Sequence, residues 1–370
     1  MSRESILNNM GNKWKLTKII LFIMLSGTWL CGCGGRNGAN TVYTADAYAL
    51  NTYVSVSLYG CGSQEIAEEA VGLCDYYEKI FSRTDEASLL SILNEAGSMT
   101  AEDVLRYEQN AGTSGGLTNT GQTDVEDESA RIYADLYELV AAGLEYGRLT
   151  EGALDITIEP LSSLWDFGSG PEHAPDAELI SQACARVDYT KVKLSQDAIE
   201  LNGARIDLGA VAKGYIADAI CEYLLKQGID SALVNLGGNI ACIGDKPDGS
   251  GFTIGIQRPF DESGDIMQTL SVSDMSVVTS GIYERYFYEG DNFYHHILDP
   301  KTGYPCDNGL MSVTIISESS TICDCLSTGC FVLGKDKALE LIDSMDDVYA
   351  VFVDENYEIT YSEGAEKFLK

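Results

Sequence analysis

A lysine follows a glycine turn in residues 206–215, which read IDLGAVAKGY. A helix is predicted from about Val211, so free backbone N–H groups and the positive end of the helix dipole lie beside Lys213. Such a combination can bind a phosphate oxygen. The same residues would also form a plain glycine turn before an amphipathic helix with an exposed lysine, and this stretch alone leaves both interpretations open.

An aspartate and a threonine stand four residues apart in residues 323–328, CDCLST, at the start of another predicted helix. At this spacing the side chains of Asp324 and Thr328 point to one side of the helix, about one turn apart. Together with a backbone carbonyl from elsewhere, they form a partial oxygen shell of the kind that Mg²⁺ accepts when phosphates and water complete it. An aspartate near a helix start can instead cap the helix or interact with its dipole.

Two further stretches combine glycine, carboxylates and aromatic or hydroxyl side chains, at residues 149–168 and 279–303. The second contains His295 and His296, and neighbours in an extended segment point to opposite faces, so at most one of them faces a shared cleft. With no third ligand nearby, a hydrolytic zinc site is not expected. The chain also lacks a Walker loop and a G-x-G-x-x-G turn, which argues against P-loop NTP hydrolysis and Rossmann dinucleotide binding.

The elements that must position these residues are strands and helices in irregular order, which favours an α+β fold over a doubly wound α/β sheet. Hydrophobic spacing predicts helices at residues 63–81, 129–146, 176–187, 211–227, 321–333 and 335–344. Short apolar or alternating runs predict strands at residues 53–59, 192–194, 199–201, 232–236, 252–256, 270–272, 311–316 and 348–353. Residues 97–128 lack periodicity and contain the run GTSGGLTNTGQT, so we expect a mobile surface insertion there.

Composition narrows the class of protein. The chain has 370 residues, of which 45% are hydrophobic and 22% charged, a balance typical of a globular protein. Its net charge of −33 would repel nucleic acid, so no nucleic-acid partner is expected. The cysteines beyond residue 33 form no C-x-x-C pair, and we expect them to be mostly free and buried.

The N-terminus has the pattern of an export signal. Lysines in residues 13–18 precede an apolar run at 19–25, which is too short for a resident membrane helix. The sequence Leu30-Cys31-Gly32-Cys33 then resembles the bacterial lipobox, in which the last cysteine is acylated. We therefore predict Cys33 as a lipid anchor. The alternative is an ordinary cleaved signal with two incidental cysteines.

The predicted layout follows from this signal. Residues 1–32 are a signal peptide, residues 33–42 a flexible tether, and residues 43–370 the folded domain. The mature chain is expected on the extracytoplasmic face of a bacterial cell membrane. Because the domain is acidic, it would not adhere to anionic lipid by itself, so we expect that the anchor is covalent or that there is none.

Five motifs follow one another in an order that resembles the ApbE family of FAD:protein FMN transferases. They are T-x-G-A-L-D-I-T-x-x-P-L-x-x-L-W-D-F-G from Thr150, I-D-L-G-x-x-A-K-G-Y from Ile206, T-S-G-x-Y-E-R-Y from Thr279, Y-H-H-I-L-D-P-x-T-G-Y-P from Tyr294, and D-C-L-S-T from Asp324. Residues 49–60 also resemble the first strand of that family. The chain departs from the family at residues 50–52, which read LNT where M-G-T is common.

The resemblance implies a single catalytic α+β unit of the tunnelling-fold-like kind, with FAD in a cleft between two lobes. It implies that Mg²⁺ is bound by the side chains of Asp324 and Thr328 and by the backbone carbonyl of Ala210. The implied FAD contacts are Ala153, Leu154, Asp155, Asp207, Lys213, Ser280 and His296.

The implied reaction is phosphoryl transfer. A Ser or Thr hydroxyl of an acceptor protein attacks the FMN phosphorus of FAD, and AMP leaves. Such a transition state needs positioning and charge neutralisation, which Mg²⁺, Lys213 and a helix N-terminus would supply. Either His296 or Asp299 would take the proton of the hydroxyl. Two alternatives are an Mg²⁺-dependent FAD pyrophosphatase and a non-enzymatic lipoprotein that binds FAD.

Overall fold

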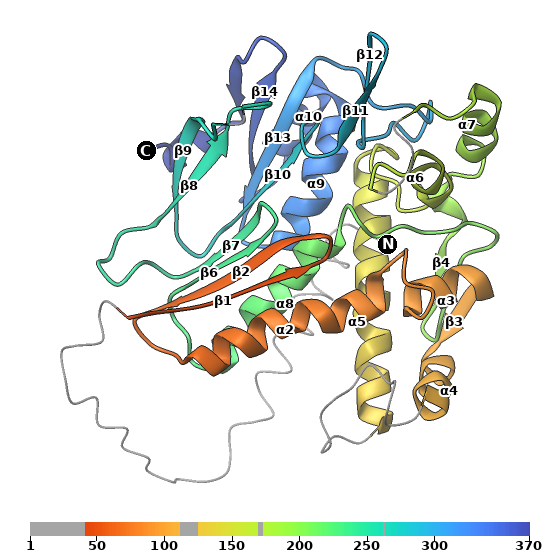
Figure 1. Cartoon of the computed structure of the whole chain (residues 1–370), viewed down its shortest axis with the longest axis horizontal. Helices are drawn as coiled ribbons and strands as arrows, with labels where there is room; N and C mark the ends of the chain where they lie inside the picture. Colours follow the sequence, from red (N-terminus) through yellow and green to blue (C-terminus); the bar gives the residue numbers. More distant parts are fainter. Residues whose placement is uncertain (1–40, 112–124, 169–172, 262) are drawn as a thin grey trace. The chain divides into compact units, whose positions relative to one another are not determined.

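The computed structural model describes residues 41–111, 125–168, 173–261 and 263–370 (Figure 1). The predicted signal peptide, Cys33 and nearly all of the tether lie outside these residues. Within the described ranges, every helix is too short or too polar to cross a bilayer.

One large antiparallel sheet forms the centre of the fold. Its strands run in the order β1-β2-β6-β7-β10-β13-β14-β15. The bounds are β1 (Val42–Ala49), β2 (Thr52–Tyr59), β6 (Ala232–Leu236), β7 (Asn239–Ile243), β10 (Ser276–Gly281), β13 (Leu310–Ser317), β14 (Tyr349–Asp354) and β15 (Ile359–Tyr361).

Both faces of this sheet are covered at its middle. Helix α9 (Ser320–Leu333) packs on β10 and β13, as Figure 1 shows. Ile316 of β13 instead joins an apolar cluster with the hairpin of β8 (Phe252–Gln257) and β9 (Ile266–Val272). All eight residues of β13 are consequently buried, which explains why this strand reads as a nearly continuous apolar run.

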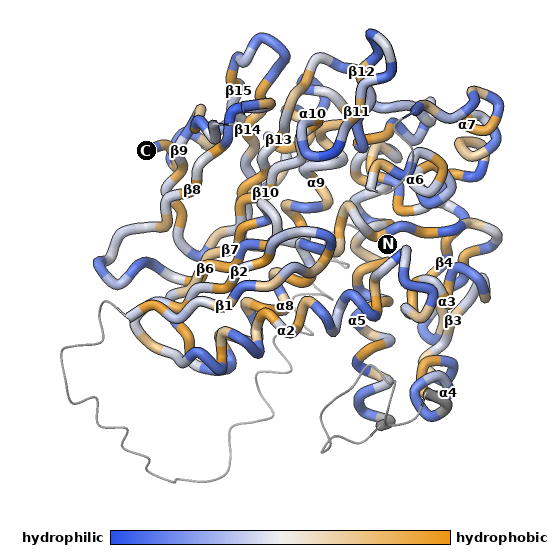
Figure 2. The backbone as a smooth tube through the Cα atoms, viewed as in Figure 1, coloured by the Kyte–Doolittle hydropathy of each residue, from blue (hydrophilic) through white to orange (hydrophobic). Residues whose placement is uncertain are grey.

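Helix α2 (Gln64–Phe81) covers β1 and β2 and packs against α8 (Ala212–Lys226). Ser63 caps α2, because its side chain accepts the Ile66 N–H. Figure 2 shows polar and apolar residues alternating along α2, and its buried residues include Ala70, Val71 and Cys74. An amphipathic helix of this kind presents one stripe to the core.

Helix α10 (Lys335–Asp343) packs against α9 and β14. The other α-helices and strands lie around the long helix α5 (Val125–Leu149) and the loops near its C-terminal end. They are α3 (Leu89–Ala96), β3 (Ser98–Thr100), α4 (Ala101–Ala111), α6 (Glu159–Trp165), α7 (Ala177–Cys184), β4 (Lys193–Leu194), β5 (Ala198–Glu200), β11 (Tyr286–Glu289) and β12 (Asn292–His295). Trp165, the last residue of α6, packs against α7 and the β11–β12 hairpin, and its indole N–H donates to the Gly303 carbonyl over 2.8 Å.

The α+β fold predicted from the sequence is confirmed, and the six predicted helices are present within a few residues of their expected bounds. The prediction of a mobile insertion across residues 97–128 is wrong at both ends, because β3 and α4 occupy residues 98–111 and α5 begins at Val125. Met99 is buried against this region's core and Val104 anchors α4 there. The run GTSGGLTNTGQT itself lies outside the described residues.

The nine cysteines in the described part of the chain are free, as expected. Five are buried, namely Cys74, Cys242, Cys323, Cys325 and Cys330, whereas Cys61 is exposed. Burial raises the pKa of the Cys74 thiol to about 12. These buried thiols therefore act as small apolar side chains.

Candidate functional site

The first turn of α8 and the side of α9 meet at a hydrogen bond between two predicted site regions. The Gly214 N–H donates to Oδ2 of Asp324 over 2.8 Å, and Asp324 is only 3% exposed. A Cβ on residue 214 would lie 2.4 Å from the Ser320 carbonyl oxygen and 2.7 Å from the Asp324 Cβ. Only glycine permits this approach, so the helix start predicted to bind phosphate and the aspartate predicted to bind Mg²⁺ are in direct contact.

A second carboxylate links the same two helices, but here the carboxylate belongs to α8 and the N–H groups belong to α9. Asp218 of α8 accepts the Ser320 N–H over 2.8 Å and the Thr321 N–H over 2.9 Å, at the start of α9. The hydroxyls of Ser319 and Thr321 also donate to Asp218. Each helix thus satisfies otherwise unpaired N–H groups in the first turn of the other, and this fixes Asp324 relative to Lys213.

The charge of Asp324 is only partly balanced within the protein. Burial raises the pKa of its carboxyl, while the Lys213 charge, the Gly214 N–H and the Asn239 side chain act in the opposite direction. Glu284 is close enough to interact with the charges of both Lys213 and Asp324. An added cation would therefore be stabilised at this position.

Thr328 lies one turn beyond Asp324 on α9, and it meets a predicted FAD contact. Its hydroxyl is 3.2 Å from the hydroxyl of Ser280 on β10, which is also 2.8 Å from that of Ser327. Ser327 in turn donates to the Asp324 carbonyl. Strand β10 and helix α9 therefore bring together Ser280 and Thr328, which belong to two different motifs.

The donors around Asp324 suit a hard cation. They are a carboxylate, hydroxyls and nearby backbone carbonyls, which are the oxygen ligands that Mg²⁺ prefers. In the described ranges no group of three or more His, Cys, Asp or Glu side chains could hold a metal ion. Soft or imidazole-rich coordination is accordingly not available among the described residues, whereas a few oxygens completed by phosphate and water would fit.

The loop that carries Ala153, Leu154 and Asp155 packs against α9 beside Thr328. A Cβ on Gly329 would lie 2.7 Å from the Thr150 side chain and 3.4 Å from the Leu154 Cβ. Ala153 and Leu154 are 5% and 2% exposed. The first and last motifs are thus adjacent.

The Asp155 carboxylate holds two loops in place. Its Oδ1 accepts the Thr157 N–H over 2.8 Å, and its Oδ2 accepts the Tyr189 N–H over 3.0 Å. Burial raises the pKa of this carboxyl, and its hydrogen bonds oppose that effect. The structure thus shows Asp155 bonded to protein groups on both oxygens.

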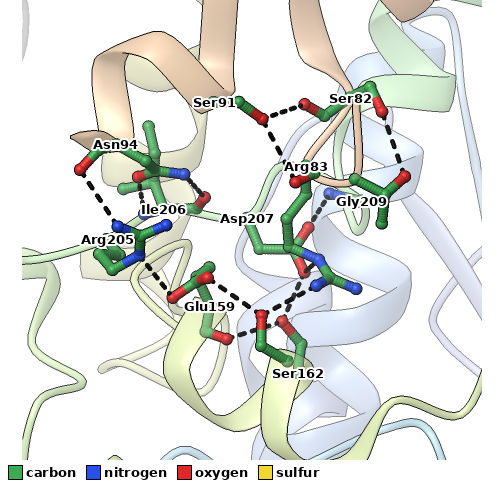
Figure 3. A network of polar contacts seen from close by, with 12 residues as sticks. Ser82, Arg83, Ser91, Asn94, Glu159, Ser162, Arg205, Ile206, Asp207 and Gly209 are labelled. Atoms are coloured by element: carbon green, nitrogen blue, oxygen red, sulfur yellow. Dashed lines mark hydrogen bonds and ion pairs between the residues drawn. The ribbon is translucent and has the colours of Figure 1, made fainter. Parts of the chain in front are cut away.

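Asp207 lies at the start of the loop that leads to Ala210 and α8. Figure 3 shows it between Arg83 and Ser162, which come from separate elements. Its backbone N–H donates to the Ile156 carbonyl over 2.8 Å, which links this loop to the Ala153–Asp155 loop. Ala210 itself stands two residues before the first residue of α8 and is partly buried.

His296 approaches the site from the end of β12. Its backbone N–H donates to the Arg285 carbonyl over 3.1 Å, and Nδ1 of its ring lies 3.3 Å from the same oxygen. Burial, followed by the charges of Arg285, His295 and Lys213, lowers the pKa of His296 to about 3. The ring is therefore neutral near pH 7, and it lies near Lys213.

His295 faces the interior instead, at 4% exposure, and its Nε2 lies 3.0 Å from the Cys306 carbonyl oxygen. Burial lowers its pKa to about 4.

Asp299 belongs to a tight turn rather than to this group of charges. Its Oδ1 accepts the Lys301 N–H over 2.8 Å, and its carbonyl accepts the Gly303 N–H, where φ is +75°. Burial raises the pKa of the Cys184 and Cys306 thiols, and the negative charge of Asp299 raises it further. Of the two predicted proton acceptors, His296 is thus the one whose surroundings include Lys213.

Two surface hollows of about 450 and 340 Å³ lie on other parts of the described surface. The first is lined by residues such as Cys61, Asp230 and Lys246, and the second by Ile180, Cys184 and Tyr304. Neither lining includes a predicted site residue. The site is therefore defined by its converging side chains.

Sequence reasoning missed several residues of this region. Arg83 and Ser162 contact Asp207 across 124 and 45 residues, and no local pattern announces such pairs. Gly214 did carry a signal, because a glycine in the first turn of a predicted helix often marks a close approach. Glu284 stood within a quoted motif, but its type alone did not reveal that its charge interacts with that of Lys213.

Comparison with known proteins agrees with this geometry. The sequence pattern of the ApbE family matches residues 50–352. A Treponema pallidum protein named FAD:protein FMN transferase is 32% identical over 349 residues, which cover 88% of each chain. A Klebsiella pneumoniae protein of the same name is 37% identical over 231 residues, which cover 61% of this chain and 71% of that protein.

Solved structures show the same fold. The crystal structure of the ApbE protein from Thermotoga maritima superposes with a TM-score of 0.73 at 31% identity, covering 89% of this chain and all of that one. The flavin transferase ApbE from Vibrio cholerae superposes with a TM-score of 0.71 at 23% identity, and it supports the fold alone. This chain therefore belongs to the ApbE family.

Proposed function

We propose that this protein is an enzyme that transfers FMN from FAD to a Ser or Thr hydroxyl of an acceptor protein and releases AMP. The names of its relatives support the transfer of FMN. The observation that carries the proposal is the contact between Gly214 and Asp324, which sets a helix N-terminus, a lysine and a buried carboxylate side by side. Such a group of charges can hold a diphosphate through a cation.

The side chains of Asp324 and Thr328, with the carbonyl of Ala210, would hold Mg²⁺. When bound, this ion would neutralise the diphosphate of FAD and orient it for in-line attack. Lys213 would bind a phosphate oxygen and stabilise the charge that develops there. Ser280 would orient Thr328 through the hydroxyl contact between them.

His296 would take the proton from the attacking hydroxyl. An imidazole must be unprotonated before it accepts a proton, and the lowered pKa keeps this ring neutral at physiological pH. Asp299 would stabilise the turn at residues 299–303, because its carboxylate is bonded within that turn.

The enzyme would act outside the cytoplasm, anchored through a lipid on Cys33. The basic, apolar and small-residue order of residues 13–33 supports this location. Its acceptor would then be an extracytoplasmic protein, such as a subunit of a membrane redox complex. The residues after Cys33, GGRNGAN, would serve as a flexible tether.

The test uses the full chain in detergent with FAD, Mg²⁺ and a candidate acceptor. AMP release and covalent flavin fluorescence of the acceptor are followed in parallel. Asp324→Ala should abolish AMP release, because the buried carboxylate beside Lys213 is lost. Asp336→Ala is the matched control, since Asp336 lies exposed in the first turn of α10 and should leave activity unchanged.

The outcomes separate the proposal from its alternatives. Fluorescent acceptor together with AMP supports transfer. AMP with free FMN would instead indicate a pyrophosphatase, and no AMP at all would indicate a protein that only binds FAD. Full activity of Asp324→Ala would exclude the proposed metal ligand.

A further inference from the structure

We infer that Arg83 is a positioning residue, which acts through Asp207 to hold the loop of residues 207–211 in the conformation that the reaction needs. The inference rests on the proposed function, because that loop carries Ala210 and leads directly into the Lys213 turn. Arg83 itself lies just after α2, far from these residues in sequence. No role in the site follows from the motifs for this arginine.

The Asp207 carboxylate is bonded on both of its oxygens. Arg83 Nε lies 3.0 Å from Oδ2, and the Ser162 hydroxyl donates to the same oxygen over 2.6 Å. Oδ1 accepts the Gly209 N–H over 2.9 Å. The side chains of Arg83 and Asp207 are 24% and 15% exposed, so water weakens this pair less than it weakens a surface pair.

The guanidinium of Arg83 joins two elements at once. While Nε faces Asp207, Nη1 donates to the Ser163 hydroxyl of α6 over 2.9 Å. A lysine has no planar fork and could keep only one of these contacts. Arg83 therefore both balances the charge of Asp207 and fixes the orientation of its carboxylate (Figure 3).

A second set of contacts holds the segment just before Asp207. Arg205 Nε lies 3.1 Å from Glu159 Oε2 on α6, and its Nη1 lies 2.8 Å from Glu95 Oε1 on α3. Asn94 donates to the Ile206 carbonyl over 2.8 Å and accepts the Ile206 N–H over 2.7 Å. With its upstream end fixed in this way, the loop has its remaining freedom at residues 207–211, where Arg83 acts.

The support that Arg83 gives to Asp207 is transmitted to the site through the backbone of a single residue, Gly209. Gly209, whose N–H is held by Asp207, is bonded covalently to Ala210, whose carbonyl is the proposed cation ligand. The Val211 N–H donates to the Leu208 carbonyl over 3.0 Å, which closes the turn before α8. Release of Asp207 would therefore loosen Ala210 and Lys213 together, without removing either of them.

The residues that support Asp207 are not specified by the five motifs. Ser162 and Ser163 stand at positions that the five motifs leave open, and so does Glu159, whereas Arg83 lies outside all five. The motif residue Asp207 is thus supported by side chains that the motifs do not specify. One oxygen of the Asp207 carboxylate accepts a hydrogen bond from the protein's own backbone, at Gly209.

The experiment compares Arg83→Met, Arg83→Lys and the control Arg106→Met in the full-length chain. Arg106 also forms ion pairs, with Glu102 and Asp103, but it is 63% exposed on α4. Hydrogen exchange of metal-free and FAD-free protein is measured at the amides of residues 207–211. Arg83→Met should exchange severalfold faster there, Arg83→Lys should be intermediate, and Arg106→Met should match the parent.

A second readout is the Mg²⁺ concentration that half-saturates AMP release. It should rise about 10-fold in Arg83→Met, the size expected when a residue that orients a metal ligand is lost. Ser162→Ala, which removes only one hydroxyl from Asp207, should change both readouts in the same direction by less.

Two results would overturn the inference. One is unchanged exchange at residues 207–211 together with unchanged Mg²⁺ half-saturation in Arg83→Met. The other is faster exchange across the whole described chain, which would indicate a general loss of stability. If the parent releases no AMP, the proposed function fails, but the exchange data still decide whether Arg83 holds this loop.

Discussion

His296 shows how neighbouring charges prepare a side chain for a chemical step. Burial is the main reason that His296 resists protonation, and the positive charges of Arg285 and Lys213 nearby add to this effect. The same lysine is attracted to Asp324, so positive and negative groups alternate around the start of α8. Of the two candidate proton acceptors, His296 is the one that lies near Lys213, whereas the carboxylate of Asp299 accepts a backbone N–H in its own turn.

The pH dependence of activity tests this assignment. Since the pKa of His296 is lowered to about 3 from its usual 6.5, the ring stays neutral as the pH falls from 8 to 5. We expect no loss of kcat/KM near pH 6.5 that depends on this residue. His296→Ala should lower kcat by ~10²–10⁴, whereas His173→Ala, at an exposed position, should not. A decline near pH 6.5 that disappears in His296→Gln would contradict the lowered pKa, and full kcat in His296→Ala would contradict the role of His296 as the proton acceptor.

At the residue scale, local spacing predicts contacts within one helix better than contacts between distant segments. Asp324 and Thr328 are four residues apart, so helical geometry placed them on one side without further information. Gly214 and Asp324 are 110 residues apart, and their hydrogen bond depends on how two helices pack. Arg83 was missed for the same reason, because its partner Asp207 is fixed only by the fold.

At the scale of elements, the contact between α8 and α9 decides the geometry of the site. Glycine at 214 allows the helices to approach so closely that an alanine methyl would meet the Ser320 carbonyl carbon at 2.8 Å and its oxygen at 2.4 Å. Backbone atoms cannot turn aside as a flexible side chain can. The helices would have to separate, and Asp324 would move with α9.

Gly214→Ala should therefore reduce both stability and activity. We expect a loss of about 1–3 kcal/mol in the free energy of unfolding, measured by urea titration, together with a large fall in AMP release. Gly72→Ala is the control, because nothing lies within 4 Å of a Cβ there, on the exposed side of α2. That change should stabilise the helix by about 0.5–1 kcal/mol. Equal stability of the two variants would show that the helices have room to adjust.

Elements with local signals were predicted well, and those that depend on partners were not. Helix α2 was found because Ser63 caps it and its apolar residues recur at helical spacing. Strand β10, which reads SVVTSG, offers little alternation, since it lies between β7 and β13 in the sheet. Helix α4 was missed because its sequence, AEDVLRYEQNA, is mostly polar and its apolar contact is concentrated at Val104.

For the molecule as a whole, one partly buried carboxylate links pH to stability. Asp135 of α5 accepts a hydrogen bond from the Tyr215 hydroxyl of α8 over 2.8 Å. Burial raises the pKa of Asp135 to about 6, although Tyr215 and Arg131 act in the opposite direction; Glu138 and Glu222 raise it further. The folded protein therefore holds this proton more tightly than the unfolded chain does.

The sign of the effect follows from proton linkage. Between pH 4 and 6 the folded state binds more protons than the unfolded state at this group, so the free energy of unfolding falls as the pH rises. Asp135→Asn should remove about 2 kcal/mol of that decline, as measured by thermal unfolding at both pH values. Asp127→Asn, exposed on the same helix, changes the charge equally and should follow the parent. A parallel decline in Asp135→Asn and the parent would contradict this linkage.

The exchange of hydrogen bonds between the starts of α8 and α9 also limits how this protein can evolve. Asp218 accepts an N–H at the start of α9, and Asp324 accepts one at the start of α8. A sequence change at either helix start therefore alters the packing of both helices. A lineage that replaced Gly214 would need a simultaneous change around Ser320 to restore the spacing. These two segments, a hundred residues apart, should therefore change together, and a chimera that takes only one of them from a homologue with a different residue at Gly214, Asp218 or Asp324 should fail.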